Sequence, residues 1–255
     1  MNLGSGMNPI IRIASYVFIA LTASAHVLAC PAESNKLEIN APHGVALLNP
    51  SFKHYLSNIC ERLPPLPGPP GSTQIGNCAE LIAAIASGVD INERKERKEF
   101  GAYSMCIASA VVGTGAGASA SRFDLHQAGK QIAAYLDLAS VRSSLAPQRP
   151  ATHYFLSNFQ FKSIHVDPYS VKLATDHFRY NFDVLAAGDF RHSGSRELLV
   201  RFTDRAIGGS YDSATILILS WPLEQDVIEA TDAIDYLRDA KAPTPHADGA
   251  RPLRQ

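Results

Sequence analysis

The chain has 255 residues, of which 46% are hydrophobic, and its 23 cationic and 24 anionic side chains give a net charge of −1. This length and apolar content support one large folded domain or two small ones. The balanced charge excludes the basic footprint that nucleic-acid-binding proteins carry, so we expect no nucleic-acid partner.

Residues 1–29 have the order of a bacterial secretory signal. Arg12 is the only lysine or arginine before Glu33, and a mostly apolar run follows over residues 13–25. A membrane-spanning helix needs about 20 apolar residues, and this run is shorter. We therefore predict a signal peptide over 1–29 and export to the periplasm or cell envelope.

The signal offers two cleavage patterns. Ala23-Ser24-Ala25 fits the ordinary small-x-small rule, whereas Val27-Leu28-Ala29 before Cys30 resembles a bacterial lipobox. In the second case Cys30 carries lipid, and this lipid is the only membrane contact that we expect. In the first case Cys30 is free for a disulfide, because the four cysteines of an exported chain meet an oxidising compartment.

Residues 30–146 are predicted to form a helical region of about four helices. The first helix starts near Pro50 and has apolar residues at helical spacing up to Cys60. The proline-rich stretch 64–71 follows as an extended linker. Further helices are predicted after Asn77, over 92–112 and over 124–138, with Asn77 and Glu80 forming a capping box.

Two cysteines of this region occupy matching positions on neighbouring helices. Cys78 lies about a dozen residues before the turn near residue 90, and Cys106 lies a similar distance after it. In an antiparallel helix pair they face each other, so we predict a Cys78–Cys106 disulfide, although four cysteines allow three pairings. Cys60 then pairs with Cys30, or stays free if Cys30 carries lipid.

Residues 147–240 are predicted to form an antiparallel β region with a closing helix over 223–238. Alternating apolar and polar residues indicate a half-buried strand over 177–184, and further strands are predicted at 153–166, 197–204 and 211–220. The tail 241–255 is rich in proline, alanine and charge and is predicted to be disordered. The fold class is therefore α+β, with a disulfide-stapled helical region before a small antiparallel sheet and a C-terminal helix.

The segment 188–211, GDFRHSGSRELLVRFTDRAIGGSY, carries the most distinctive motif. It resembles the FG-GAP type of loop, GDFNGDGxxDLLV, of uncharacterised exported bacterial proteins. That resemblance implies calcium ligands at Asp189 and Glu197 and a sharp turn at Gly194. Arg191 and Ser193 stand where the family has its two middle oxygen ligands. Because Arg191 can neutralise the carboxylates, we predict a metal-free turn and no cofactor.

Other motifs point less clearly to chemistry. GTGAGA at 113–118 fits a loose dinucleotide fingerprint but follows a predicted helix, so we expect a loop between helices. His165 and Asp167 share one strand face, with His153 and His177 on neighbouring strands. Such groups bind zinc when they converge, whereas lone surface histidines are commoner. No common hydrolase, zinc-protease, thiol-oxidoreductase or phosphate-loop motif is present.

These observations favour a binding protein over an enzyme. The expected function is recognition of another envelope protein, for instance as an inhibitor or immunity-type factor. The alternatives are an envelope hydrolase with a His/Asp site on the sheet, and a calcium-stabilised structural module of the cell surface.

Overall fold

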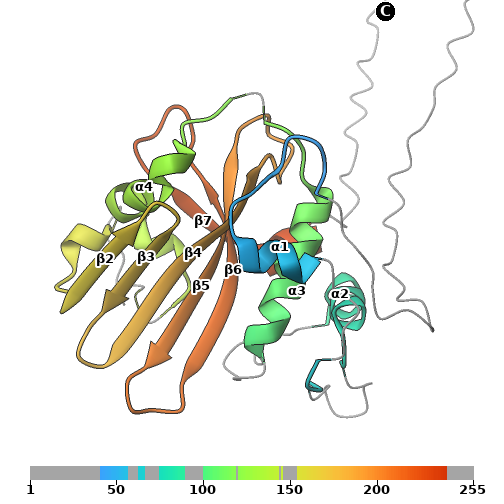
Figure 1. Ribbon diagram of the computed structural model, residues 1–255, viewed down its shortest axis with the longest axis horizontal. Coiled ribbons are helices and arrows are strands. Elements are labelled where there is room, and N and C mark those ends of the chain that lie inside the picture. The colour runs from blue at the N-terminus through green and yellow to red at the C-terminus, as the bar shows by residue number, and fades with distance from the viewer. Residues whose placement is uncertain are drawn as a thin grey trace, which may run out of the picture.

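The computed structural model describes residues 41–56, 63–66, 75–89, 100–118, 120–143, 145 and 154–239. Its centre is an antiparallel seven-stranded sheet in the order β2-β3-β4-β5-β6-β7, in which β1 pairs with β4 beside β3. The strands are β1 (Ala46–Leu47), β2 (Ser163–Asp167), β3 (Ser170–Ala174), β4 (Phe178–Gly188), β5 (Glu197–Ala206), β6 (Asp212–Ser220) and β7 (Glu229–Asp232). The α+β class is therefore correct (Figure 1).

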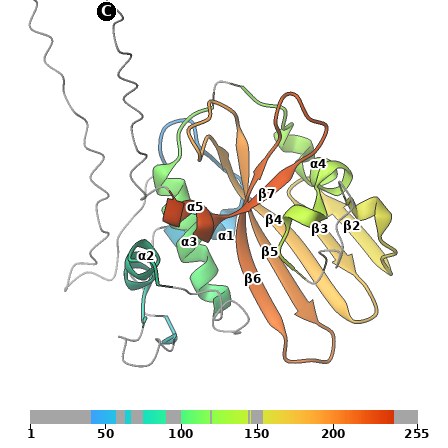
Figure 2. The same ribbon diagram turned by 180° about the vertical axis from the view of Figure 1, so that it is seen from behind.

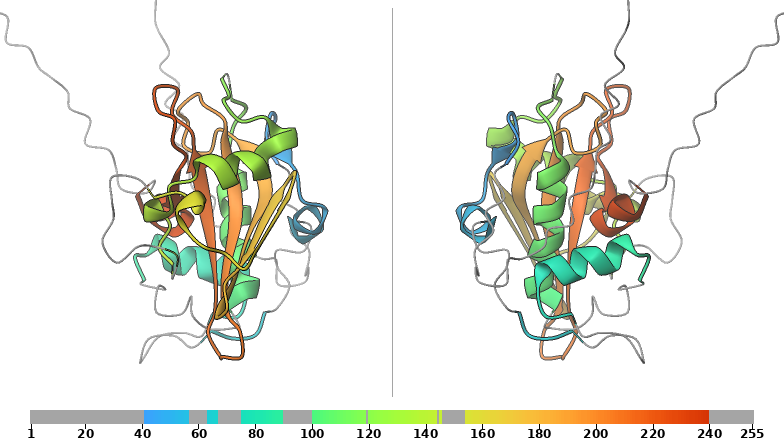
Figure 3. Two further views of the ribbon diagram at one scale, coloured as in Figure 1. Left: turned by 90° about the vertical axis from the view of Figure 1, so that its left-hand side faces the viewer. Right: turned by 90° about the vertical axis from the view of Figure 1, so that its right-hand side faces the viewer.

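Helices cover both faces of the sheet. On one face lie α1 (Pro50–Leu56), α3 (Phe100–Thr114) and α5 (Ala233–Asp239), and α2 (Cys78–Ala86) packs mainly against α3 and α5. The opposite face carries α4 (Ala128–Tyr135) together with short 3₁₀ turns, η2 (Leu125–Gln127), η3 (Leu138–Ser140) and η4 (Leu156–Asn158). Figures 2 and 3 show this layering from behind and from the two sides.

The period-two alternation of the strands divides the core into two clusters. Leu199, Ile216 and Ile218 point toward α1, α2, α3 and α5, whereas Leu198, Val200 and Leu217 point toward α4. All six side chains are buried. Because strand residues alternate between the faces, β5 and β6 contribute to both clusters and hold the two helical layers to one sheet.

The disulfide between Cys78 and Cys106 is present and joins α2 to α3, with the two Cα atoms 5.1 Å apart. The hydroxyl of Tyr55, from α1, lies 3.3 Å from each sulfur. The expected cap of α2 is also present, because the Glu80 amide donates to Asn77 Oδ1 at 2.9 Å. The Glu80 carboxylate reaches one residue further back than predicted and accepts from the Gly76 amide at 2.6 Å.

Three sequence-based element predictions need correction. Within the predicted strand 153–166, the described part before residue 163 contains η4, because Asn158 Oδ1 accepts from the Phe155 amide and turns the chain. The predicted helix 124–138 is a 3₁₀ turn followed by α4, which ends at Tyr135 because Leu136 is extended and bridges to Ile228.

The predicted closing helix 223–238 is the third correction. Residues 229–232 form β7, in which Leu219 of β6 lies opposite Ala230, and only Ala233–Asp239 is helical. Strand pairing with β6 overrides the helical periodicity of this segment. The predictions for 1–40, the linker beyond Leu66, residues 90–99 and the tail after Asp239 lie outside the described residues.

Candidate functional site

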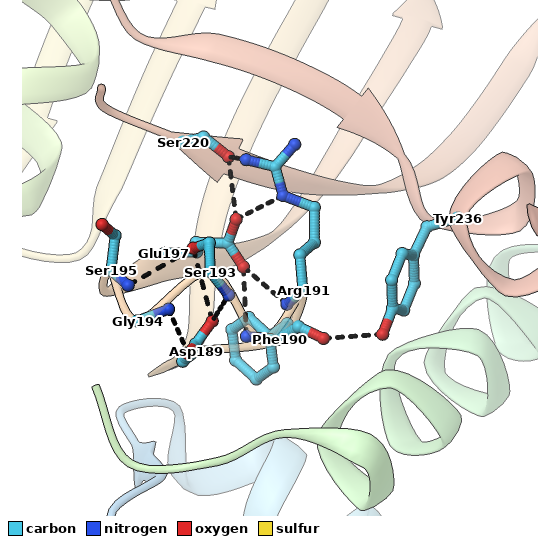
Figure 4. Close-up of polar contacts among 9 residues, drawn as sticks. All are labelled: Asp189, Phe190, Arg191, Ser193, Gly194, Ser195, Glu197, Ser220 and Tyr236. Atoms are coloured by element: carbon cyan, nitrogen blue, oxygen red, sulfur yellow. Dashed lines mark hydrogen bonds and ion pairs between the residues drawn. The ribbon is translucent and has the colours of Figure 1, made fainter. Parts of the chain in front are cut away.

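The carboxylates that resemble calcium ligands flank the loop between β4 and β5, with Asp189 directly after β4 and Glu197 at the first position of β5 (Figure 4). Asp189 is 5% exposed and accepts from the Ser193 amide at 2.8 Å and the Gly194 amide at 2.7 Å. His192 and Gly194 have positive φ angles of 55° and 79°, which turn the chain back toward this carboxylate. The backbone of Asp189 also pairs with Ala116, which fixes the start of the loop.

Glu197 is 1% exposed and has its own set of donors. Its Oε2 accepts from the amides of Phe190 and Arg191, each at 3.0 Å. Its Oε1 accepts from the Arg191 guanidinium and from the hydroxyl of Ser220 at 3.0 Å. Tyr236 of α5 adds a bond to the Phe190 carbonyl at 2.6 Å and so ties the loop to the helical layer.

These contacts make the two carboxylates acceptors for the loop's own N–H groups. Arg191, which replaces a ligand of the FG-GAP pattern, pairs with Glu197 rather than with Asp189. Among the described residues, no group of three or more His, Cys, Asp or Glu side chains could hold a metal ion. The loop is chemically suited to holding the β4–β5 connection in place.

A second candidate lies on the half of the sheet beyond the N-terminal end of α3. There the strand register places side chains of five strands in rows on one face. One row contains Ser163, Ala174, Arg179, Arg205 and Asp212. The next row contains His165, Lys172, Asn181, Thr203 and Ala214.

These rows and the first turn of α3 line a hollow of about 680 Å³, which we call the sheet hollow. It is lined by Gly101, Ala102, Ser163, His165, Lys172, Leu173, Ala174, Arg179, Tyr180, Asn181, Arg201, Thr203, Arg205, Asp212 and Ala214. Four of these residues are lysine or arginine, and Asp212 is the one carboxylate among them. The described lining of the sheet hollow therefore carries an excess of positive charge.

Among the described residues, the charges of the sheet hollow are only partly compensated. Arg205 pairs with Asp212 at 2.7 Å, and Arg201 lies across from Asp183 on the neighbouring strand. Burial raises the pKa of Asp183, while Arg201, Lys172 and the Asn181 amide act in the opposite direction. Lys172 and Arg179 are exposed, so their charges are accessible from outside the protein.

Arg201 and Asn181 form the floor of the sheet hollow. The Arg201 guanidinium donates to Ser104 Oγ at 3.3 Å and to the Gly101 carbonyl at 3.5 Å, which holds it against α3. Asn181 Nδ2 donates to Asp183 Oδ2 at 2.6 Å. Its Oδ1 is buried and has no hydrogen-bond partner in the described part of the chain, which leaves an acceptor at the floor.

His165 and Asp167 lie where the sequence placed them, on the same face of β2. His165 Nε2 lies 3.1 Å from Asp167 Oδ1, and the Ser170 hydroxyl donates to Asp167 Oδ2 at 3.0 Å. The His165 side chain is 68% exposed and the Asp167 side chain 44%. His177 lies in the turn before β4, and His153 lies outside the described residues.

The remaining sequence candidates are structural or lie outside the described part. Residues 115–118 follow a helix rather than a strand, and Ala116 pairs with Asp189. Cys30 and Cys60 are not among the described residues. Within the segments that the structure describes, no helix is both long enough and apolar enough to cross a membrane.

Sequence reasoning missed the sheet hollow. Its signal is a cation in each of three successive strands, with Lys172 in β3, Arg179 in β4, and Arg201 and Arg205 on one face of β5. Only the register brings these positions together. Comparisons of the chain with protein-family models, curated proteins and solved structures gave no match.

Proposed function

We propose that this protein is an exported binding protein and that the sheet hollow receives an acidic part of another envelope protein. The proposal rests on one observation. Three neighbouring strands direct Lys172, Arg179, Arg201 and Arg205 into one open hollow, and Asp212 is the single carboxylate among its described lining residues. Complementary charge across an interface steers association and selects partners. An inhibitor or immunity-type role fits this arrangement, because such a protein acts by occupying its partner.

The test compares two charge reversals in a pull-down from envelope extract. Lys172→Glu with Arg179→Glu reverses two exposed charges of the sheet hollow, and Lys130→Glu reverses an exposed charge on α4, on the other face. We expect the wild type and the Lys130 variant to retain the same stoichiometric partner, and the double variant to lose it. Capture should weaken as salt rises, because exposed charges are screened. Equal capture by all three proteins would reject the proposal.

The second candidate is an envelope hydrolase that uses the His165–Asp167 pair. A carboxylate that accepts from a histidine can orient it as a general base, and the 3.1 Å contact at the rim of the hollow supports this. Against it, both side chains are substantially exposed, and the neighbouring Ser170 bonds to Asp167 rather than to His165. Hydrolysis of envelope-derived peptides or glycans that is abolished by His165→Gln would favour this candidate.

The third candidate, a calcium-stabilised surface module, rests on the FG-GAP resemblance of 188–211. The hydrogen bonds of Asp189 and Glu197 support a metal-free loop instead.

The two cleavage patterns before Cys30 remain distinct proposals. Mass spectrometry of the mature N-terminal peptide distinguishes them. A diacyl group on Cys30 would show that the protein is anchored to the membrane by lipid, and an unmodified Cys30 would show that it lacks this anchor.

A further inference from the structure

The sheet has one lateral edge that the described part of the chain leaves open. The part of β4 that extends past β3 pairs with β1, so this edge of β4 is not open. The outer side of β7 is bonded to the segment near η3, where the Ala230 amide donates to Ser140 Oγ at 2.9 Å. Just before β7, Leu136 bridges to Ile228. No described strand pairs with the outer side of β2.

The register shows which backbone groups this open edge presents. The Thr175 amide donates to the Phe178 carbonyl at 2.9 Å, which makes these two residues a hydrogen-bonded pair of the β3–β4 ladder. Antiparallel pairs alternate along a ladder, so Lys172 directs its N–H and C=O toward β2, where its partner is His165. Ile164 and Val166 then direct their N–H and C=O groups away from the sheet. No hydrogen bond from another described residue reaches these groups.

The two faces of β2 differ in chemistry. His165 lines the sheet hollow beside Lys172. On the other face, Ile164 is 55% exposed and Val166 packs at the margin of the core under α4. A strand added to β2 would therefore place the side chain opposite His165 beside Lys172 and the side chains opposite Ile164 and Val166 against apolar surface, because directly opposed residues point to the same face.

We infer that the open edge of β2 binds an extended segment of the partner as an additional antiparallel strand. The recognised pattern is apolar–acidic–apolar, with the acidic residue opposite His165 and the apolar residues opposite Ile164 and Val166. The acidic side chain then lies at the rim of the sheet hollow, within the field of Lys172. This inference rests on the proposed function, since it names how the acidic partner is held.

Charge argues against a second copy of this chain as the occupant. An antiparallel β2–β2 pair centred on His165 would place the two histidines opposite each other and bring two sheet hollows side by side. Each hollow carries Lys172, Arg179, Arg201 and Arg205, and like charges across a strand pair are unfavourable. A segment of opposite charge meets no such repulsion.

The test uses the full exported chain and the synthetic peptide acetyl-Val-Glu-Val-Glu-Val-amide, in three forms. In the proposed register, the valine amides opposite Ile164 and Val166 donate to β2, whereas the glutamate amides point away. N-methylation of the two valines that lie opposite Ile164 and Val166 should weaken binding by about 10- to 30-fold, which is the effect of losing two backbone hydrogen bonds. N-methylation of the glutamates should change it by less than about 3-fold, because those amides make no bond to β2.

Amide hydrogen exchange supplies the second readout. Binding should slow exchange at Ile164 and Val166, whose amides become bonded, and leave that of His165 unchanged, because it already pairs with Lys172. If both methylated peptides bind as tightly as the parent and exchange at the edge does not change, the strand inference is wrong while the acidic-partner proposal stands. If N-methylvaline weakens binding but Lys172→Glu does not, the edge binds the strand and the role of the hollow charges is wrong.

Two further outcomes reject the inference. Absence of binding by all three peptides at millimolar concentration would show that β2 does not recruit this pattern. Slow exchange of Ile164 and Val166 in the free protein, together with a dimer at higher concentration, would assign the edge to a second copy.

Discussion

Replacement of Glu197 by alanine tests the structure most directly. The carboxylate accepts from the amides of Phe190 and Arg191, from the Ser220 hydroxyl and from the Arg191 guanidinium. Glu197→Ala removes all four acceptor contacts at a site that is 1% exposed. Each buried donor left without a partner costs about 1–3 kcal/mol. The Arg191 side chain is 37% exposed and can be rehydrated, so its share is smaller.

The expected loss in the free energy of unfolding is therefore about 3–5 kcal/mol. In a domain of this size, about 1 kcal/mol corresponds to 2–4 °C in Tm, so the midpoint should fall by roughly 6–20 °C. Urea denaturation can be followed by the fluorescence of Trp221, the only tryptophan, which packs against Phe123 and Tyr135. The matched control is Glu224→Ala, at an exposed position, which should change stability by less than about 0.5 kcal/mol.

Measuring the Tm with and without calcium distinguishes a metal-free loop from a calcium site. If the N–H groups of the loop already occupy the carboxylates, millimolar calcium should leave the Tm of the wild type as it is in EDTA. An occupied site would add about 2.7 kcal/mol at a hundredfold excess over its Kd. A calcium-dependent rise that Asp189→Ala removes, or a Glu197→Ala loss below about 1 kcal/mol, would refute the reasoning.

Three other predictions follow from the described contacts. Replacing both Cys78 and Cys106 by alanine should cost about 3–4 kcal/mol, because the bridge closes a loop with a sequence separation of 28; reduction of the wild type should give a similar loss in the same denaturation assay. Gly129→Ala should cost about 1–3 kcal/mol, since its Cβ would lie 2.0 Å from the Asp167 carbonyl oxygen. Gly101→Ala, where the nearest atom outside the helix lies at 3.7 Å, should be neutral or stabilising, and equal losses would refute the steric argument. Asp183→Asn should stabilise the protein at neutral pH, because burial raises the pKa of Asp183. Because the folded-state pKa of Asp183 is raised, its carboxyl group contributes stability below the unfolded-state pKa, and this contribution is lost as pH rises through the folded-state pKa. The gain in stability from Asp183→Asn should therefore disappear in acid. A gain that is independent of pH would contradict this origin.

The sequence contained the local determinants of the fold. The Asn77 cap, the cysteine spacing and the alternation over 177–184 each depend on residues near one another in the chain, and each is found in the structure. Of the helix predicted over 223–238, the part after residue 232 is present as α5, whereas the part before it was wrong, because β7 depends on Leu219 and its neighbours, which lie elsewhere in the chain. β3 was missed because Ser170–Ala174 is short and its pairing partners decide its state.

The candidate site shows the same limit. Arg191 was correctly considered as a partner for one of the two carboxylates, because Arg191 and Glu197 are only six residues apart in the chain. The sheet hollow was not predicted, because Lys172, Arg179 and Arg201 belong to three strands and become neighbours only through the register. A charge pattern within one strand cannot reveal which strand will lie beside it.

The sheet hollow lies where the described part of the helical layer ends. Leu199 on β5 and Ile216 on β6 are apolar and lie under this layer. Two residues along β5 from Leu199, Arg201 meets the first turn of α3, at Gly101 and Ser104. Beyond that point Thr203 and Arg205 face the hollow instead of a helix. The change from apolar to cationic side chains on this face therefore coincides with the N-terminal end of α3. Within the described part of the chain, no helix covers this half of the sheet, which lies next to the open edge of β2.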